Sequence, residues 1–183
     1  IKIKPKKLDH IPKLHLVEQG ALAKVDGIVH VSQALAEKQV GERMAQSAKM
    51  HLGGLEVPKE IKIEYVDSSS IGTGITLVGK YSSDDSFTDE FNPVILGVDR
   101  LGEKNITAEE IGKQCALSLL DAHNSAAPVD KHLGDMLIPF LGLFGGEIHV
   151  EEITNHLKTN IYVVEKFLKK KFKIDERNKV ISL

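Results

Sequence analysis

Asn105–Asn124, with the sequence NITAEEIGKQCALSLLDAHN, predicts the most sharply bounded helix of the chain. Thr107 and Glu110 have the spacing of a capping box, in which each side chain accepts a hydrogen bond from a free backbone N–H at the helix start. Apolar side chains then recur at four-residue intervals, at Ile111, Cys115 and Leu119. Cys115 lies on this apolar face, so we expect it to be a buried core residue and not a nucleophile.

The residues before this helix predict several strands around one further helix. Apolar runs on both sides of Asp26-Gly27 predict two strands joined by a tight turn. Apolar residues from Leu35 to Leu52 recur with helical spacing, and Gly53-Gly54 would end that helix. Alternation and turn residues predict the remaining elements: strands over 60–66, 75–81 and 93–98, with 75–81 as the hairpin partner of 60–66, and an acidic loop over 82–92.

The residues after Asn124 predict a second set of elements. Asp130–Phe144 is strongly apolar on one side and predicts a buried helix that Pro139 kinks or interrupts. Further patterns predict a strand over 147–153, a polar turn over 155–160, a helix over 161–170, and short strands over 1–4, 14–17, 172–175 and 180–183. Helices and short strands are interleaved, so the predicted fold class is α/β (α+β), with helices on one face of mixed sheets.

Composition and charge exclude several classes of protein. Of the 183 residues, 42% are hydrophobic and 27% are charged, as in a globular protein and unlike a disordered chain or a disulfide scaffold. The net charge of −2 gives no global basic excess, although residues 157–183 hold eight Lys or Arg against three Asp or Glu. The single cysteine favours a reducing compartment such as the cytoplasm. No apolar run reaches the roughly 18–20 residues of a membrane span, so no membrane is expected as a partner.

Three segments hold residue types that could carry chemistry. The N–H groups of Ser68–Gly74 could hold a phosphate, although a hairpin turn is the simpler interpretation. His156 precedes Thr159 and Asn160, two good N-caps, and would lie beside a helix dipole that favours anions. Its imidazole could act as a nucleophile, but the residues alone favour a structural histidine. His132 and Asp135 share one helix face, and the residues alone favour a solvated first turn over a pocket.

Three segments are informative together: GEKNITAEEIGKQCALSLL (Gly102–Leu120), APVDKHLGDMLIPFLGL (Ala127–Leu143) and HLKTNIYVVEKFLKKKF (His156–Phe172). In their order and spacing they resemble the RNA 3'-terminal phosphate cyclase family. The helix motif Val40–Met44 and the turn Ser70–Ile75 are similar to family motifs as well. The resemblance covers nearly the whole chain but only the C-terminal half of a typical family member.

The resemblance implies an ATP-dependent enzyme that converts the 3'-phosphate of RNA into a 2',3'-cyclic phosphate. In the family a histidine takes AMP from ATP, the AMP passes to the RNA 3'-phosphate, and the neighbouring 2'-hydroxyl closes the ring and expels AMP. By motif position this histidine is His156, and a divalent cation, with Mg expected, would bridge phosphate oxygens. His132, Asp135 and Met136 fall at positions of the nucleotide pocket. Met136 replaces the Gln of many members and would present an apolar wall.

The resemblance also implies two bodies. Residues 1–16 and 125–183 would form a core module of two helices on a four-stranded sheet, and residues 17–124 would form an inserted β-α-β-β-β-α domain. The N-terminal half of the family, which holds the triphosphate and the RNA end, has no counterpart here. We therefore expect the C-terminal part of a longer enzyme, inactive alone, whose partners are the missing half, ATP and RNA with a 3'-phosphate end.

Two other classes of function are compatible with the same residues. A non-catalytic cyclase-like scaffold in RNA processing is one, and His156 argues against it because that branch lacks the nucleophilic histidine. A plain RNA-binding module that uses the basic C-terminal segment is the other. The run Lys169–Lys171 lies at a predicted helix C-terminus, where cations are favoured in any case, so a solvated helix end is the simpler interpretation.

Overall fold

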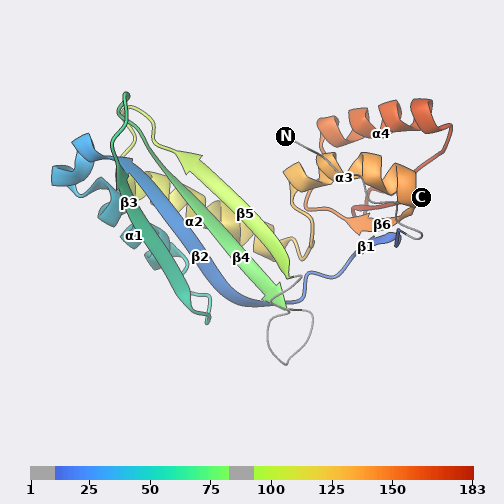
Figure 1. Cartoon of the computed structure of the whole chain (residues 1–183). Coiled ribbons are helices and arrows are strands. Elements are labelled where there is room, and N and C mark those ends of the chain that lie inside the picture. The colour runs from blue at the N-terminus through green and yellow to red at the C-terminus, as the bar shows by residue number, and fades with distance from the viewer. Residues whose placement is uncertain (1–10, 83–92) are drawn as a thin grey trace. The chain divides into compact units, whose positions relative to one another are not determined.

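The computed structural model describes residues 11–82 and 93–183, which form two compact units. Glu18–Pro128 is the continuous unit, and Val129–Leu183 with the described residues before Glu18 is the discontinuous unit (Figure 1). Each unit combines helices with a sheet of four strands, so the predicted α/β (α+β) class is confirmed. The assignment of a core module and an inserted domain stays a prediction. The predicted strand over 1–4 and acidic loop over 82–92 fall on residues outside the described ranges, except for Ser82.

The continuous unit has the predicted β-α-β-β-β-α order. Its elements are β2 (Ala21–Ser32), the 3₁₀ helix η1 (Gln33–Lys38), α1 (Val40–His51), β3 (Lys59–Val66), β4 (Thr73–Ser82), β5 (Val94–Leu101) and α2 (Ala108–Asn124). The sheet order is β3-β2-β4-β5, with β2 and β3 parallel and the other pairs antiparallel. Because β2 lies between β3 and β4, the predicted hairpin of these two strands is wrong. Both long helices lie on one side of the sheet (Figure 1).

The predicted turn at Asp26-Gly27 is also wrong, because β2 runs through both residues without a break. The Asp26 carboxylate is bound by the ammonium groups of Lys24 at 3.0 Å and Lys80 at 2.8 Å. Burial alone would raise the pKa of Asp26, but the hydrogen bonds from these two lysines outweigh it and lower the pKa. A Cβ on Gly27 would lie 2.7 Å from the Leu77 side chain. Close packing, and not a turn, therefore accounts for this glycine.

Helix α2 shows one half of the predicted capping box. Thr107 Oγ1 accepts a hydrogen bond from the N–H of Glu110 at 3.2 Å. The Glu110 carboxylate instead accepts hydrogen bonds from Lys113 and Gln114 one turn further on. Cys115 is fully buried in the core between the sheet and the two helices, which confirms its prediction as a core residue.

The buried Cys115 thiol should be unreactive toward thiol reagents in the native chain. Burial raises its pKa to about 12, so the reactive thiolate is on the order of 10⁻⁴ of the population at pH 8. We expect negligible reaction with a colorimetric disulfide reagent at pH 8 and complete reaction after denaturation in urea. Stoichiometric labelling of the native chain within seconds would show that α2 is not packed on the sheet.

The discontinuous unit places two helices on a small mixed sheet. Its elements are β1 (Leu14–Leu16), α3 (Lys131–Phe144), β6 (Gly146–His149), α4 (Asn155–Leu168), β7 (Lys173–Asp175) and β8 (Val180–Ser182). The sheet order is β1-β6-β8-β7, with β1 and β6 parallel and the other pairs antiparallel. Helix α3 continues through Pro139, so the alternative of an interrupted helix is wrong. Within the part of the chain that the structure describes, no helix is both long and apolar enough to span a membrane.

Candidate functional site

Helix α4 begins earlier than predicted and carries His156 in its first turn. The predicted polar turn over 155–160 is helical, and Thr154, not Thr159 or Asn160, is the N-cap. Thr154 Oγ1 accepts a hydrogen bond from the N–H of Leu157 at 3.0 Å, and Leu157 is fully buried. Burial of this leucine therefore sets the start of the helix. His156 is exposed at the second helical position, where backbone N–H groups lack an intrahelical partner.

Helix α3 holds the other three predicted site residues. Its N-cap is Asp130, whose Oδ1 accepts hydrogen bonds from the N–H groups of His132 and Leu133, both at 2.8 Å. His132 is exposed in the first turn, and Asp135 is half-buried one turn further on. Met136 is 67% exposed. The predicted helical face of His132 and Asp135 thus lies near the start of α3.

Helices α3 and α4 pack side by side and run in the same direction. Near their starts, Asp135 of α3 is bonded to Thr154 and Asn160 of α4. Near their ends, a Cβ on Gly142 of α3 would lie 2.5 Å from the side chain of Val164 of α4. Figure 1 shows the same parallel arrangement. Two helix N-termini, with their partial positive charge, therefore lie at one end of the pair and carry His132 and His156.

Asp135 connects the two helices through two hydrogen bonds. Thr154 Oγ1 donates to Asp135 Oδ1 at 3.0 Å, and Asn160 Nδ2 donates to the backbone oxygen of Asp135 at 3.0 Å. The predicted nucleotide-pocket residue thus holds the start of α4. The residue patterns did not single out Thr154 or an interhelical role for Asn160. A usable signal was the N-cap residue Thr154 before apolar residues at helical spacing, Leu157, Ile161, Val164 and Leu168.

The exposed apolar residues of α3 form a stripe next to this site. Met136, Phe140 and Leu143 have the spacing of one helix face and are 67%, 52% and 56% exposed. Met136 is thus an exposed apolar side chain of α3, and its place in a nucleotide pocket stays a prediction. The stripe lies on the discontinuous unit, on the helix that also holds His132 and Asp135.

Several lysines of the C-terminal basic segment make contacts within the discontinuous unit. Lys158 of α4 forms an ion pair with Glu176 at 3.0 Å. Lys171 donates to Glu165 at 2.6 Å, and this hydrogen bond lowers the pKa of the Glu165 carboxyl. Lys170 donates to the backbone oxygen of Gly142 at 2.8 Å. These contacts favour a solvated helix end over an RNA-binding clamp for the run Lys169–Lys171.

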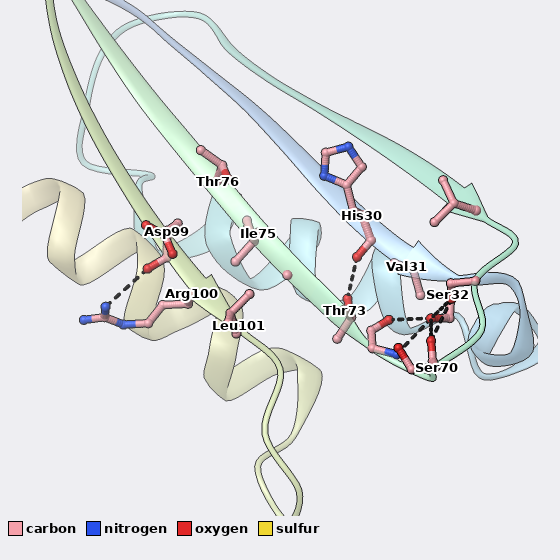
Figure 2. A pocket seen from close by; sticks show the side chains of 14 residues that line it. His30, Val31, Ser32, Ser70, Thr73, Ile75, Thr76, Asp99, Arg100 and Leu101 are labelled. Carbon is pink, nitrogen blue, oxygen red and sulfur yellow. Dashed lines mark hydrogen bonds between the residues drawn. The ribbon is translucent and has the colours of Figure 1, made fainter.

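The serine- and glycine-rich segment Ser68–Gly74 borders a hollow of about 520 Å³ on the continuous unit (Figure 2). Ser32 Oγ lies 2.9 Å from Ser68 Oγ and 3.0 Å from the backbone oxygen of Gly72, and it accepts the N–H of Gly72 at 2.8 Å. The segment links β3 to β4 past the end of β2, so the predicted hairpin turn is wrong here too. The hydroxyls of Ser32 and Ser68 hold the loop, and the described lining includes none of the four predicted site residues.

Among the described residues, metal-ligating side chains do not cluster at the starts of α3 and α4 or at the hollow of the continuous unit. Across residues 11–82 and 93–183, no group of three or more His, Cys, Asp or Glu side chains could hold a metal ion. The described residues of this chain therefore do not by themselves form a three-ligand site for a resident divalent cation.

Comparisons with known proteins identify the family. The model of the insert domain of RNA 3'-terminal phosphate cyclase matches residues 17–124. The RNA 3'-terminal phosphate cyclase of Pyrococcus abyssi is 44% identical over 163 residues, which are 89% of this chain and 44% of that protein. The cyclase of Methanococcoides burtonii is 37% identical over 174 residues, which are 94% of this chain and 47% of that protein. The chain spans a little under half the length of these curated relatives, and it belongs to the RNA 3'-terminal phosphate cyclase family.

Proposed function

We propose that this chain is the part of an ATP-dependent RNA 3'-terminal phosphate cyclase that carries its nucleophile, His156. The main support is the position of the imidazole. It is exposed in the first turn of α4, beside the start of a parallel helix. Two aligned helix N-termini favour the phosphate groups of a nucleotide, and an exposed ring nitrogen can approach a phosphorus atom from solvent. A structural histidine in the core would have neither property.

The proposed reaction has three displacements at phosphorus. A ring nitrogen of His156 attacks the α-phosphorus of ATP, and the bond to pyrophosphate breaks. An oxygen of the RNA 3'-phosphate then attacks the same phosphorus, and the N–P bond breaks and restores the imidazole. Finally the 2'-hydroxyl loses its proton and attacks the 3'-phosphorus, and AMP leaves. Each step requires positive charge near the phosphate oxygens, and the helix N-termini supply a share of it.

The other predicted residues would shape the nucleotide pocket. His132, in the first turn of α3, can stack on or donate a hydrogen bond to the nucleotide, and Met136 offers an apolar wall for a base. Asp135 has one carboxylate oxygen bonded to Thr154, so its contribution to a nucleotide would come from its other oxygen. We propose that Mg or another divalent cation takes part bound to the triphosphate, because Mg²⁺ is commonly held by substrate phosphates with only one or two protein carboxylates.

The proposed partners are ATP, RNA with a 3'-phosphate end and the part of the whole protein outside this chain. The chain matches a little under half of its relatives, so residues outside it would hold the triphosphate and the RNA end. The apolar stripe of α3 offers a surface for that part to pack on. We further propose a cytoplasmic site of action, in keeping with the single cysteine.

An assay of the full-length protein tests this proposal. It is incubated with ATP, Mg and an RNA oligonucleotide that ends in a 3'-phosphate, and the RNA is resolved by mass spectrometry. We expect the loss of one water mass from the RNA, one AMP per turnover, and no reaction of the matched 3'-hydroxyl oligonucleotide. The isolated 183-residue chain should give no product. RNA binding by the full-length protein without any product would instead favour the non-catalytic scaffold.

A further inference from the structure

We propose that Thr154 is a positioning residue for the reactive imidazole, with Asp135 and Asn160 as the groups that hold it and its helix in place. This inference rests on the proposed function, because it assumes that His156 reacts. None of the three residues needs to touch the nucleotide for this role. They act through the backbone of the first turn of α4.

The hydroxyl of Thr154 uses its donor and acceptor capacity at the same time. Its single proton is donated to Asp135 Oδ1 at 3.0 Å, and a lone pair accepts the N–H of Leu157 at 3.0 Å. A hydroxyl that donates to a carboxylate becomes a better acceptor, because the two hydrogen bonds polarise each other. The cap of α4 is therefore stronger than that of a threonine that donates to water.

Two hydrogen bonds that one residue of α3 accepts fix α4 at two points. Asp135 accepts from Thr154 through its carboxylate and from Asn160 through its backbone oxygen, both at 3.0 Å. The two anchored positions are six residues apart, about 1.7 turns of helix. Contacts at two levels set both the axial position and the rotation of α4 relative to α3. His156 lies between them, so its direction follows from this pairing.

The pairing matters because in-line attack on phosphorus depends on orientation. An error of about 1 Å in the position of a reacting group can cost on the order of 10²-fold in rate. The imidazole of His156 is exposed, so neighbouring side chains of the unit do not enclose it. Its placement therefore depends on the backbone from which it projects, and that backbone is held by Thr154.

The experiment compares variants of the full-length protein in the formation of the covalent AMP adduct. Thr154→Val keeps the shape of the side chain but removes both hydrogen bonds, and Thr154→Ser keeps both. We expect the first-order rate constant of adduct formation at saturating ATP to fall about tenfold in Thr154→Val and to stay within about twofold of wild type in Thr154→Ser. KM for ATP should change less than about twofold in both variants, because the nucleotide contacts remain.

The matched control is Thr107→Val, because Thr107 caps α2 in the continuous unit by the same hydrogen bond to the third helical N–H. This variant loses a helix cap of the same kind, at a position remote in sequence from His156. The rate of adduct formation should therefore not change. Amide hydrogen exchange checks the fold. In Thr154→Val the first turn of α4 should exchange about tenfold faster, with the protection of α3 unchanged. If Thr154→Val does not fold, Asn160→Ala tests the second anchor. We expect its rate constant of adduct formation to be about threefold lower than that of wild type.

The possible results separate this inference from the proposed function. A wild-type protein that forms no AMP adduct refutes the proposed function and this inference with it. A wild-type protein that forms the adduct, together with Thr154→Val at the wild-type rate, refutes only the positioning role. An equal loss in Thr154→Ser and Thr154→Val also refutes it, because the hydroxyl would then be irrelevant. A loss confined to Thr154→Val and restored in Thr154→Ser supports it.

Discussion

Full-length protein with His156→Ala should form no covalent AMP adduct with ATP and Mg, a loss of at least about 10³-fold relative to wild type. The physical reason is that alanine has no nitrogen with which to form the N–P bond. The substitution removes no packing from the core, because His156 is exposed and its side chain is not part of the core. Intact-protein mass spectrometry after exposure to ATP measures the adduct directly, and cyclisation of RNA should be lost in parallel.

Two histidine variants serve as controls for this loss. His132→Ala removes a side chain from the neighbouring helix start, so it should raise KM for ATP and still permit the adduct. His51→Ala removes a histidine of the continuous unit whose Nδ1 lies 2.8 Å from the Ser47 carbonyl oxygen, and it should behave as wild type. An adduct of equal amount on His156→Ala would remove His156 from its proposed role. Loss of the adduct in His132→Ala alone would indicate that the nucleophile is His132 of α3.

The residue pattern places the helix that carries His156 too late in the chain, and the roles of His132, Asp135, Met136 and His156 stay predictions. The helix over 161–170 was predicted too late because Asn155–Asn160 is rich in residues of low helix propensity. The structure starts α4 at Asn155, since Leu157 packs into the core and Thr154 satisfies its N–H. Tertiary burial thus outweighs local propensity. The position of His156 changes from a turn before a helix to the first turn of the helix itself.

Long-range contacts explain what the sequence did not predict in the continuous unit. Asp26-Gly27 is a common turn dipeptide, but Asp26 is paired with Lys80, which is remote in the sequence. Pairing with a distant strand also determines the positions of β3 and β4, which are consecutive in the chain and yet flank β2. By contrast, α2 was predicted closely, because its cap, its apolar face and its end all depend on residues within the helix.

Gly112→Ala should destabilise the continuous unit by about 3 kcal/mol, although alanine is the better helix former by about 1 kcal/mol. A Cβ on Gly112 of α2 would overlap the backbone oxygen of Met44 and lie 3.2 Å from the backbone nitrogen of Ala48, both in α1. Neither atom can rotate away, because both belong to the hydrogen-bonded backbone of a helix. The two helices must therefore separate, which loosens the packing of Met44, Ala48 and Ala116 in the core.

Hydrogen exchange of the amides in α1 and α2 measures this effect in the 183-residue chain, because it reports on the continuous unit independently of the other. Gly97→Ala is the control, since a Cβ there would meet no atom within 4 Å, and its effect should stay within about 0.5 kcal/mol. Exchange rates in Gly112→Ala equal to those of wild type would mean that α1 and α2 are less closely packed than described. Faster exchange in the α4 amides as well would mean that the two units unfold together.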